Sequence, residues 1–327
     1  MFIKYTVLLL IFFASSFLSA QEKDTLIIKN EEGVNDTIII EDDDWNDDWE
    51  DNSNEWDRDW DEFKWEFDFH NFHSSPAISV TYGLSEIKRD DIAAKFGKPN
   101  LFEAKLGYAG MRTQWADNII KYKFSFFRIS NISTKLSGKD FSNSELESST
   151  WRFGLGSEKG YGWRFGESAI IPYNSFSLDW TRLEMKDLPP AEPVLILLGV
   201  NNDRERVLNY HETFRFGTSA QGGVKFKLIS GITLEAAYER SIVFERHLFW
   251  KWTGSIIIEA AGQGLLDKFI SEIMDSSPYA APIVNFVLKN ALSYGIYELR
   301  QEKMNWPFDS APPLSYDQFK FGLTFMF

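Results

Sequence analysis

The sequence predicts an all-β fold, an antiparallel transmembrane β-barrel of eight or ten strands with a helical hairpin inserted before the last strand. Three observations lead to it. Short runs of alternating apolar and polar residues recur from Pro76 to the end of the chain. The apolar positions are rich in Phe, Trp and Tyr, which make up 16% of the chain, and the polar positions carry charges beside glycines. Alternate side chains of a strand point to opposite faces, and a barrel wall in lipid turns its apolar face outward.

The final stretch, Tyr316–Phe327, shows this pattern most clearly. Its phenylalanines and one leucine alternate with Lys320, Gly322, Thr324 and Met326. One face of this strand is therefore large and mostly aromatic, and the chain stops on it without a polar tail. A barrel strand with one face in lipid has this character.

The other alternating runs give, with the terminal one, eight clear strands and one or two arguable ones. They cover residues 77–83, 102–109, 120–126, 151–155, 163–165, 176–180, 214–216, 224–226 and 232–239. Short turns are expected at 116–118 and 229–231, and long loops at 86–100, 134–148 and 187–210. The alternation is not clean from Gly160 to Tyr173, so one strand there is misplaced or missing. An even strand number is the physical expectation for a single-chain bacterial barrel.

The polar face is expected to line the lumen. Its predicted members are Glu103, Lys105, Lys121, Lys123, Arg152, Arg164, Asp179, Arg215, Glu235, Glu239 and Lys320. Both signs of charge are present, and buried charges need partners. Eight strands enclose little more than side chains. The sequence therefore predicts a lumen that is crossed by ion pairs and largely closed, and it places a carboxylate opposite Lys320.

A helical insertion is expected at about residues 256–300. Apolar residues recur there at helical spacing in two segments, and Pro278 and Pro282 lie between them. The alternatives are a hairpin packed on itself in a long loop, a plug inside the lumen, or a helix on the membrane surface. The aromatic and basic residues of 244–252 suit a membrane interface.

The N-terminal part divides into two expected segments, residues 1–20 and 21–75, ahead of a barrel at 76–327. Residues 1–20 have a basic Lys4, a short apolar run and Ala20 at a cleavage site, the pattern of a secretory signal peptide. Residues 21–75 are expected to form a partly disordered periplasmic segment. The chain has no cysteine, which excludes disulfides, thiolate metal sites and a cysteine nucleophile.

Most of the net charge of −14 lies in residues 41–68, where fifteen acidic residues face Arg58 and Lys64, a net of −13. The rest of the chain is close to neutral, and no basic patch suggests nucleic acid. Disorder is one reading of this acidic segment. The other is ordering against a partner or a headgroup region, because six aromatic residues share one helical face. They are Trp45, Trp49, Trp56, Trp60, Phe63 and Phe67.

No catalytic, cofactor-binding or metal-binding residue is identified. The histidines are His70, His73, His211 and His247. None of them has the spacing of a catalytic triad or a metal cluster. His211, beside Glu212 and near Asp203 in the sequence, is the best of these weak candidates for a catalytic base. The acidic segment has no glycine, so it is not an EF-hand loop. The glycine pairs at 154–156 and 160–162 lack the strand-to-helix context of a phosphate site.

With its signal sequence, its alternating aromatic strands and its terminal Tyr-x-x-Phe-x-Phe-x-x-x-Phe-x-Phe strand, the chain resembles bacterial outer-membrane β-barrel proteins. The resemblance covers about Pro76 to Phe327. It implies an outer-membrane location, contact with lipid, and recognition of the last strand by the barrel-assembly machinery. A periplasmic protein is a further expected partner, for the acidic segment.

The first functional hypothesis is a structural, surface-interaction or narrow-transport barrel without a cofactor. The alternatives are a barrel enzyme, either a lipid-modifying hydrolase or acyltransferase or a protease, and a soluble secreted lipid-binding β-protein. An enzyme would need a base and a nucleophile near one rim.

Overall fold

The computed structural model describes residues 74–92, 96–114, 116–137, 147–186 and 206–327, all within the unit Asp59–Phe327. The expected signal peptide and acidic segment therefore lie outside the described residues. Eight antiparallel strands pair in sequence order, and β8 pairs with β1 to close a barrel. The strands are β1 (Ser75–Lys88), β2 (Asn100–Gln114), β3 (Ala116–Ser133), β4 (Ser148–Phe165), β5 (Ser168–Met185), β6 (Phe214–Ile229), β7 (Ile232–Val243) and β8 (Leu314–Met326).

The closed barrel confirms the predicted fold class and the strand number of eight. The runs predicted at 151–155 and 163–165 belong to one long strand, β4, and those at 214–216 and 224–226 both belong to β6. A two-residue turn joins β4 to β5, with Gly166 at φ 65°. This tight turn is why the alternation from Gly160 to Tyr173 could not be divided correctly from the pattern alone.

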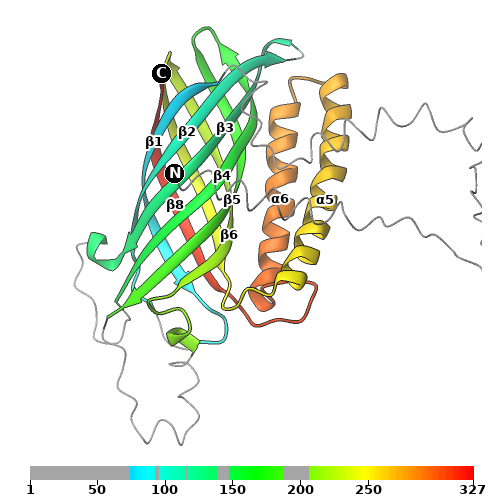
Figure 1. Cartoon of the computed structure of the whole chain (residues 1–327). Helices are drawn as coiled ribbons and strands as arrows, with labels where there is room; N and C mark the ends of the chain where they lie inside the picture. The colour runs from blue at the N-terminus through cyan, green and yellow to red at the C-terminus, as the bar shows by residue number, and fades with distance from the viewer. Residues whose placement is uncertain (1–73, 93–95, 115, 138–146, 187–205) are drawn as a thin grey trace, which may run out of the picture. The chain divides into compact units, whose positions relative to one another are not determined.

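The connections alternate in length, which gives the barrel two different ends. Short turns join β2 to β3, β4 to β5 and β6 to β7; we call this the turn end, and the C-terminus lies there (Figure 1). The predicted turn at 229–231 is correct, with Gly231 at φ 84°. The one predicted at 116–118 is wrong, because these residues already begin β3. The long connections, including η1 (Thr134–Ser137), lie at the opposite, loop end.

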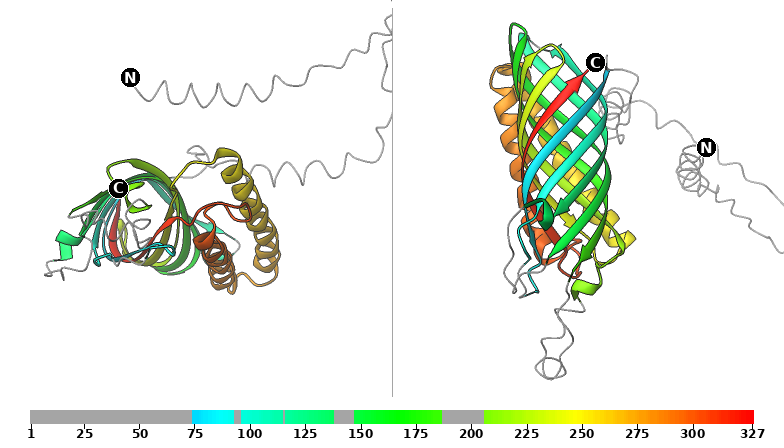
Figure 2. Two further views of the ribbon diagram at one scale, coloured as in Figure 1. Left: turned by 90° about the horizontal axis from the view of Figure 1, so that it is seen from below. Right: turned by 90° about the vertical axis from the view of Figure 1, so that its left-hand side faces the viewer.

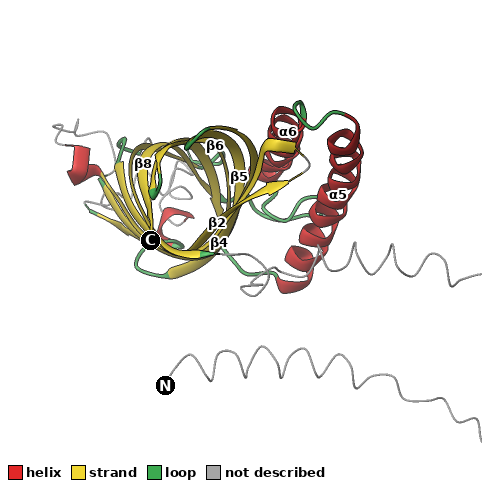
Figure 3. Ribbon diagram, turned by 90° about the horizontal axis from the view of Figure 1, so that it is seen from above, coloured by secondary structure: helices red, strands yellow, loops and turns green. Residues whose placement is uncertain are grey.

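Two helices interrupt the chain between β7 and β8, as predicted. They are α5 (Phe249–Ser276) and α6 (Ala281–Glu302), so the insertion begins earlier than residue 256. Pro282 stands in the first turn of α6, where a missing N–H costs least. Both helices stand outside the barrel, alongside its wall (Figures 1 and 2). Seen along the barrel, α6 lies nearer the wall and α5 farther away (Figure 3). The hairpin is therefore not a lumen plug.

Candidate functional site: the sealed lumen and the external hairpin

Ten ionised side chains fill the middle of the barrel, and each is at most 3% exposed. Five are cations and five are carboxylates, so the set is formally neutral. They are Lys105, Arg128, Arg152, Lys225 and Lys320, with Glu103, Glu158, Asp179, Glu235 and Glu239. Buried charges persist only when they are paired and hydrogen-bonded. The prediction of a lumen crossed by ion pairs is confirmed.

Arg128 of β3 is the most connected member. Its Nε donates to Asp179 Oδ1 at 2.8 Å and its Nη2 to Asp179 Oδ2 at 2.5 Å, which is a bidentate pair. Its Nη1 donates to Glu239 Oε2 at 2.7 Å, and its Nη2 also reaches Ser219 Oγ. One planar guanidinium thus ties β3 to β5, β6 and β7 across the lumen.

Lys320 of the last strand finds the carboxylate predicted for it. Its ammonium donates to Glu103 Oε1 at 2.9 Å and also to Glu239. Arg152 reaches the second oxygen of Glu239 at 2.8 Å and donates to Gln318 at 3.0 Å. Because Glu239 receives Arg128, Arg152 and Lys320, it is the centre of the network.

A second cluster lies nearer the turn end. Lys105 donates to Glu158 Oε1 at 2.8 Å, and Lys225 lies 3.0 Å from Glu158 Oε2 and 2.5 Å from Glu235 Oε2. Tyr173 donates its hydroxyl proton to Glu235 at 2.5 Å. Tyr122 likewise donates to Glu158 Oε2 at 3.2 Å. Glu158 and Glu235 therefore each have a cation and a neutral donor within hydrogen-bond distance.

Below this cluster, large side chains close the turn end. Tyr122, Phe124 and Phe126 of β3 point inward and are at most 4% exposed. Inward glycines on β4 make room for them: a Cβ on Gly156 would lie 2.8 Å from Phe126 Cζ. The predicted facing of β3 is therefore wrong, because its alternation was read with the aromatic residues outside.

The reversed facing places Lys121 and Lys123 on the outer wall rather than in the lumen. The other predicted lumen residues keep their inward positions. Arg164 and Arg215 lie near the two rims, where Arg164 donates to Asp117 O at 2.9 Å and Arg215 to Asn209 O. Sequence reasoning missed Arg128 and Glu158, which follow from the facing of β3 and from the full length of β4.

Apolar residues close the loop end. Val207 and Tyr210, from the connection between β5 and β6, pack with inward residues of several strands. Arg89 holds this cap: its Nε donates to Asp91 at 2.6 Å and its Nη2 to Glu245 at 2.8 Å, and its guanidinium lies 5.3 Å from the Tyr210 ring centre. Burial raises the pKa of Tyr210 above its ordinary value. The buried ion pairs therefore lie between the aromatic residues at the turn end and this apolar cap at the loop end.

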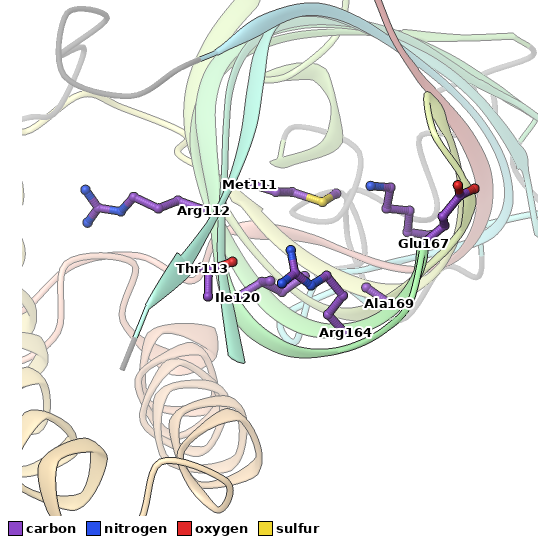
Figure 4. A pocket seen from close by; sticks show the side chains of 8 residues that line it. Met111, Arg112, Thr113, Ile120, Arg164, Glu167 and Ala169 are labelled. Atoms are coloured by element: carbon purple, nitrogen blue, oxygen red, sulfur yellow. The ribbon is translucent and has the colours of Figure 1, made fainter. Parts of the chain in front are cut away.

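One shallow pocket of about 130 Å³ lies at the turn end (Figure 4). Met111 points into the barrel there, whereas Arg112, its neighbour, points away from the lumen. Arg164, Glu167 and Lys227 give the rim a mixed charge.

The helical hairpin rests on a part of the outer wall with small and polar side chains. α6 packs along β4, β5, β6 and β7. A Cβ on Gly222 of β6 would overlap the Asn290 side chain, so this glycine permits a close approach. Small residues allow backbones to approach in the same way between membrane helices.

Polar contacts fix the two ends of the hairpin on the wall. Near the loop end, Tyr297 donates its hydroxyl to Asp317 Oδ1 at 3.1 Å, and the Arg240 guanidinium lies 4.4 Å from the Tyr294 ring centre. Near the turn end, Trp163 Nε1 donates to Tyr279 O at 3.1 Å. The hairpin therefore follows the wall from one end of the barrel to the other.

Between the two helices, ion pairs join facing positions. Arg300 lies 2.9 Å from Glu259 Oε2, and Lys289 pairs with Asp267. The hairpin exposes apolar residues, among them Ile257 and Leu265 of α5 and Val287 of α6. No helix within the described ranges is long and apolar enough to cross a membrane.

The two described histidines, His211 and His247, have structural contacts. The Nδ1 atom of His211 accepts the Met185 N–H at 3.1 Å, so this ring caps a strand end. His247 packs against Phe216 and Trp252, and His70, His73 and Asp203 lie outside the described residues. Within the described part of the chain, no group of three or more His, Cys, Asp or Glu residues is placed to hold a metal ion.

Comparisons with solved structures return small bacterial barrels. Neisserial surface protein A matches with 7% identity and a TM-score of 0.35, over 77% of this chain and 97% of that one. Ail of Yersinia pestis matches with 8% identity and a TM-score of 0.28, over 78% and 99%. The outer-membrane protein OprG of Pseudomonas aeruginosa matches with 11% identity and a TM-score of 0.23, over 78% and 98%.

A scan against family models and a search of curated proteins give no match. The fold rests on the strand pairing of the chain itself, a closed eight-strand antiparallel barrel. Likenesses at these TM-scores carry no argument about ligands or partners.

Proposed function

We propose that the chain is an integral outer-membrane barrel that serves as a sealed scaffold for a surface or structural role and does not conduct solutes. One observation carries this proposal: the ion-pair network fills the lumen between two apolar layers. A conducting eight-strand barrel would need a continuous polar gap, and eight strands leave little room for one.

The outer wall supports the membrane location. On β1, the outward residues Ile78, Val80, Tyr82 and Leu84 are 38–61% exposed. On β8, the outward Phe319, Phe321, Leu323 and Phe325 are 37–57% exposed. The inward positions of the same strands carry Ser79, Thr81, Gln318, Lys320 and Thr324. This inside-out distribution suits a wall in lipid and would be costly in water.

The hairpin and the connections outside the barrel wall support a surface role. The lumen is neutral, internally paired and closed, so it offers no accessible group to a ligand beyond the shallow rim pocket. The long connections and the hairpin are the parts that a partner can reach. Binding residues lie disproportionately on loops that a rigid scaffold holds in place.

Reconstitution tests the sealed lumen. The purified barrel is inserted into planar lipid bilayers, with heat-modifiable gel migration as the check that it is folded and a porin as the positive control. The expected result is no unitary conductance above the bare bilayer. Stable, reproducible conductance steps from the folded wild type would overturn the sealed-lumen proposal.

Fractionation tests the membrane location separately. The protein is expected to stay with the outer-membrane fraction after carbonate extraction and to need detergent for solubility. A folded, monomeric protein in detergent-free buffer would overturn the location and leave the sealed lumen untouched.

A further inference from the structure

The middle of the helical hairpin exposes only uncharged and mostly apolar side chains. On α5, the exposed positions between Lys251 and Lys268 are Ile257, Ile258, Ala261, Gly264 and Leu265. On α6, the exposed positions from Ala281 to Tyr297 are Ile283, Val287, Ala291, Tyr294 and Gly295. A helix that faces water normally carries polar and charged residues on its outer side. The outer surface of this hairpin is therefore unsuited to water along its whole middle part.

The charged side chains of the same stretch are paired between the two helices. The Arg300 guanidinium lies 2.9 Å from Glu259 Oε2, and its Nη2 donates to Ser255 Oγ at 2.9 Å. The Lys289 ammonium pairs with the half-buried Asp267 carboxylate. Charged groups within a membrane face the protein interior and pair with one another. The charges in the middle of each helix are therefore compatible with lipid on the outer face of the hairpin.

Exposed charges return at both ends of the helices. On α5, Lys251 is exposed near the loop end, and Lys268 and Glu272 are exposed on the same face toward the turn end. The 17 residues from Lys251 to Lys268 span about 25 Å at about 1.5 Å each. On α6, the first exposed charged residue is Glu298, 17 residues after the helix begins at Ala281. Both lengths match the apolar band of outer-membrane barrels, which is about 25 Å tall.

Contacts with the wall hold this apolar stretch level with the apolar outer residues of the barrel. At the loop end, Tyr297 donates to Asp317, the outward position of β8 that follows Phe319 toward this end. At the turn end, Trp163 of β4 donates to Tyr279 O. Between these contacts both helices stand alongside the wall (Figures 1 and 2). A bilayer around the barrel would therefore meet the middle of the hairpin at the same depth.

We propose that lipid acyl chains cover the exposed surface of the hairpin middle, so that α5 and α6 are embedded in the bilayer beside the barrel. This proposal rests on the proposed membrane location of the barrel and adds two helices to the part of the chain that contacts lipid. Each helix needs the other and the wall to pair its polar groups, so the hairpin enters lipid only together with the barrel. Trp250, 75% exposed near the loop end, and Tyr279, 61% exposed near the turn end, then lie at the two interfaces that such residues prefer.

A second copy of the chain is the competing occupant of this surface. Lipid is favoured because the exposed charges begin on both helices at the edges of one apolar band. An interface between two copies has no physical reason to end at those edges. The exposed apolar positions also lie on both helices, and they continue the apolar outer surface of the barrel wall.

Spin labelling tests this location, because the chain contains no cysteine and a single introduced one is labelled specifically. Ile257→Cys and Val287→Cys report on the hairpin, Val80→Cys reports on the barrel wall, and Glu272→Cys is the matched control in the charged part of α5. The labelled full-length protein is folded into phosphatidylcholine vesicles, with heat-modifiable migration as the check of folding. Collision rates of each label are measured with oxygen, which concentrates in hydrocarbon, and with a water-soluble nickel chelate.

At the two hairpin positions, the ratio of oxygen to nickel collisions is expected to match that at Val80 and to exceed that at Glu272 severalfold. Hairpin labels that collide mainly with nickel, while Val80 collides mainly with oxygen, would overturn this proposal and leave the membrane location of the barrel intact. Labels shielded from both reagents would assign the surface to a second copy and would also overturn it. Nickel collisions at Val80 itself would overturn the membrane location, and this proposal with it.

A charge placed in the middle of the apolar stretch is a second measurement. Ala261→Arg adds a cation on the exposed face of α5, and Ala261→Met is the matched control of similar length without charge. Arg near the bilayer midplane is costly, so cleavage of the hairpin by proteinase K in vesicles is expected to rise on the order of tenfold or more for Ala261→Arg. Ala261→Met is expected to be cut at the wild-type rate. Equal rates for the two variants would overturn the proposal, and the spin labels decide the matter if Ala261→Arg does not fold.

Discussion

Replacing Arg128 by Met tests whether the lumen is as dry as its packing indicates. The substitution keeps an apolar stem of similar length and removes the guanidinium. Asp179, 1% exposed, then loses both of its charged hydrogen bonds and keeps only the Ser219 hydroxyl at 2.7 Å. Glu239 keeps Arg152 and Lys320. The destabilisation therefore falls mainly on Asp179.

The expected loss is about 3–5 kcal/mol, the cost of leaving one buried partner of an ion pair alone. Adding separate values for the five lost hydrogen bonds would overstate the loss, because they share one guanidinium and are not additive. Urea unfolding of the barrel in detergent micelles, followed by heat-modifiable migration, measures the change. At a slope of about 2 kcal/mol per M, the midpoint falls by about 1.5–2.5 M.

The double variant Arg128→Met/Asp179→Asn is the matched control. It removes both charges with little change in volume, so the isolated carboxylate no longer exists. We expect it to recover at least half of the loss, which appears as a coupling free energy of about 2 kcal/mol in the cycle. The single variant Asp179→Asn leaves Arg128 with Glu239 and should lie between the two.

A loss of unfolding free energy below about 1 kcal/mol for Arg128→Met would contradict a dry lumen, because ion pairs exposed to water contribute no more than that. The lumen would then be hydrated in solution and the sealed scaffold would lose its main support. A double variant no more stable than Arg128→Met would also contradict it, by showing that the loss comes from packing.

Three further predictions concern the loop end and the hairpin. Gly222→Leu should push Asn290 and α6 off the wall and speed proteolysis of the hairpin while the barrel stays heat-modifiable; Gly264→Leu, with nothing within 4 Å of its Cβ, is the control and should not. Arg89→Met should destabilise the loop-end cap by about 1–3 kcal/mol in urea unfolding, and an unchanged midpoint would show that the cap does not contribute. Burial lowers the pKa of His247 from 6.5, so the unfolded chain binds the proton more readily and stability should fall as pH drops below 6.5. His247→Phe should weaken this dependence, measured as urea midpoints between about pH 8 and about pH 5.

Much of the barrel wall could be predicted because alternate side chains of a strand lie on only two faces. A strand whose polar side carries charge and glycine leaves little choice, as β8 shows: Lys320 was expected to meet a carboxylate and meets Glu103 and Glu239. The helical hairpin could also be predicted, because helical spacing of apolar residues and Pro278 are local sequence signals.

β3 was assigned the wrong way round because both of its faces contain bulky groups. Aromatic residues face outward on average in such barrels, but on β3 Tyr122 and Phe126 point inward. The correcting signal was on the neighbouring strand: Gly156 of β4 has no side chain, and this leaves space for the inward ring of Phe126. Which face of a strand points into the lumen depends on the neighbouring strand as well, so the sequence of one strand alone does not determine it.

The position of the hairpin could not be read from its own sequence, because periodicity gives a buried stripe without saying what buries it. The signal was again on the other partner, in the small outward residues Ala220 and Gly222 of β6 and Ala236 of β7. Large outward residues return beyond them, at Phe214 and Phe226. A local absence of bulk on a lipid-facing wall therefore predicts something docked there.

These exceptions to the apolar wall lie on one side of the barrel. On β1 and β8 the outward residues from Ile78 to Leu84 and from Phe319 to Phe325 are all apolar, which suits lipid. From β4 to β7 the wall carries the seat of α6. A wall that faced lipid all round would have no physical reason for this asymmetry, because every strand would meet the same solvent. One side of the wall therefore keeps its apolar residues exposed, and the other holds α6 against its small outward residues.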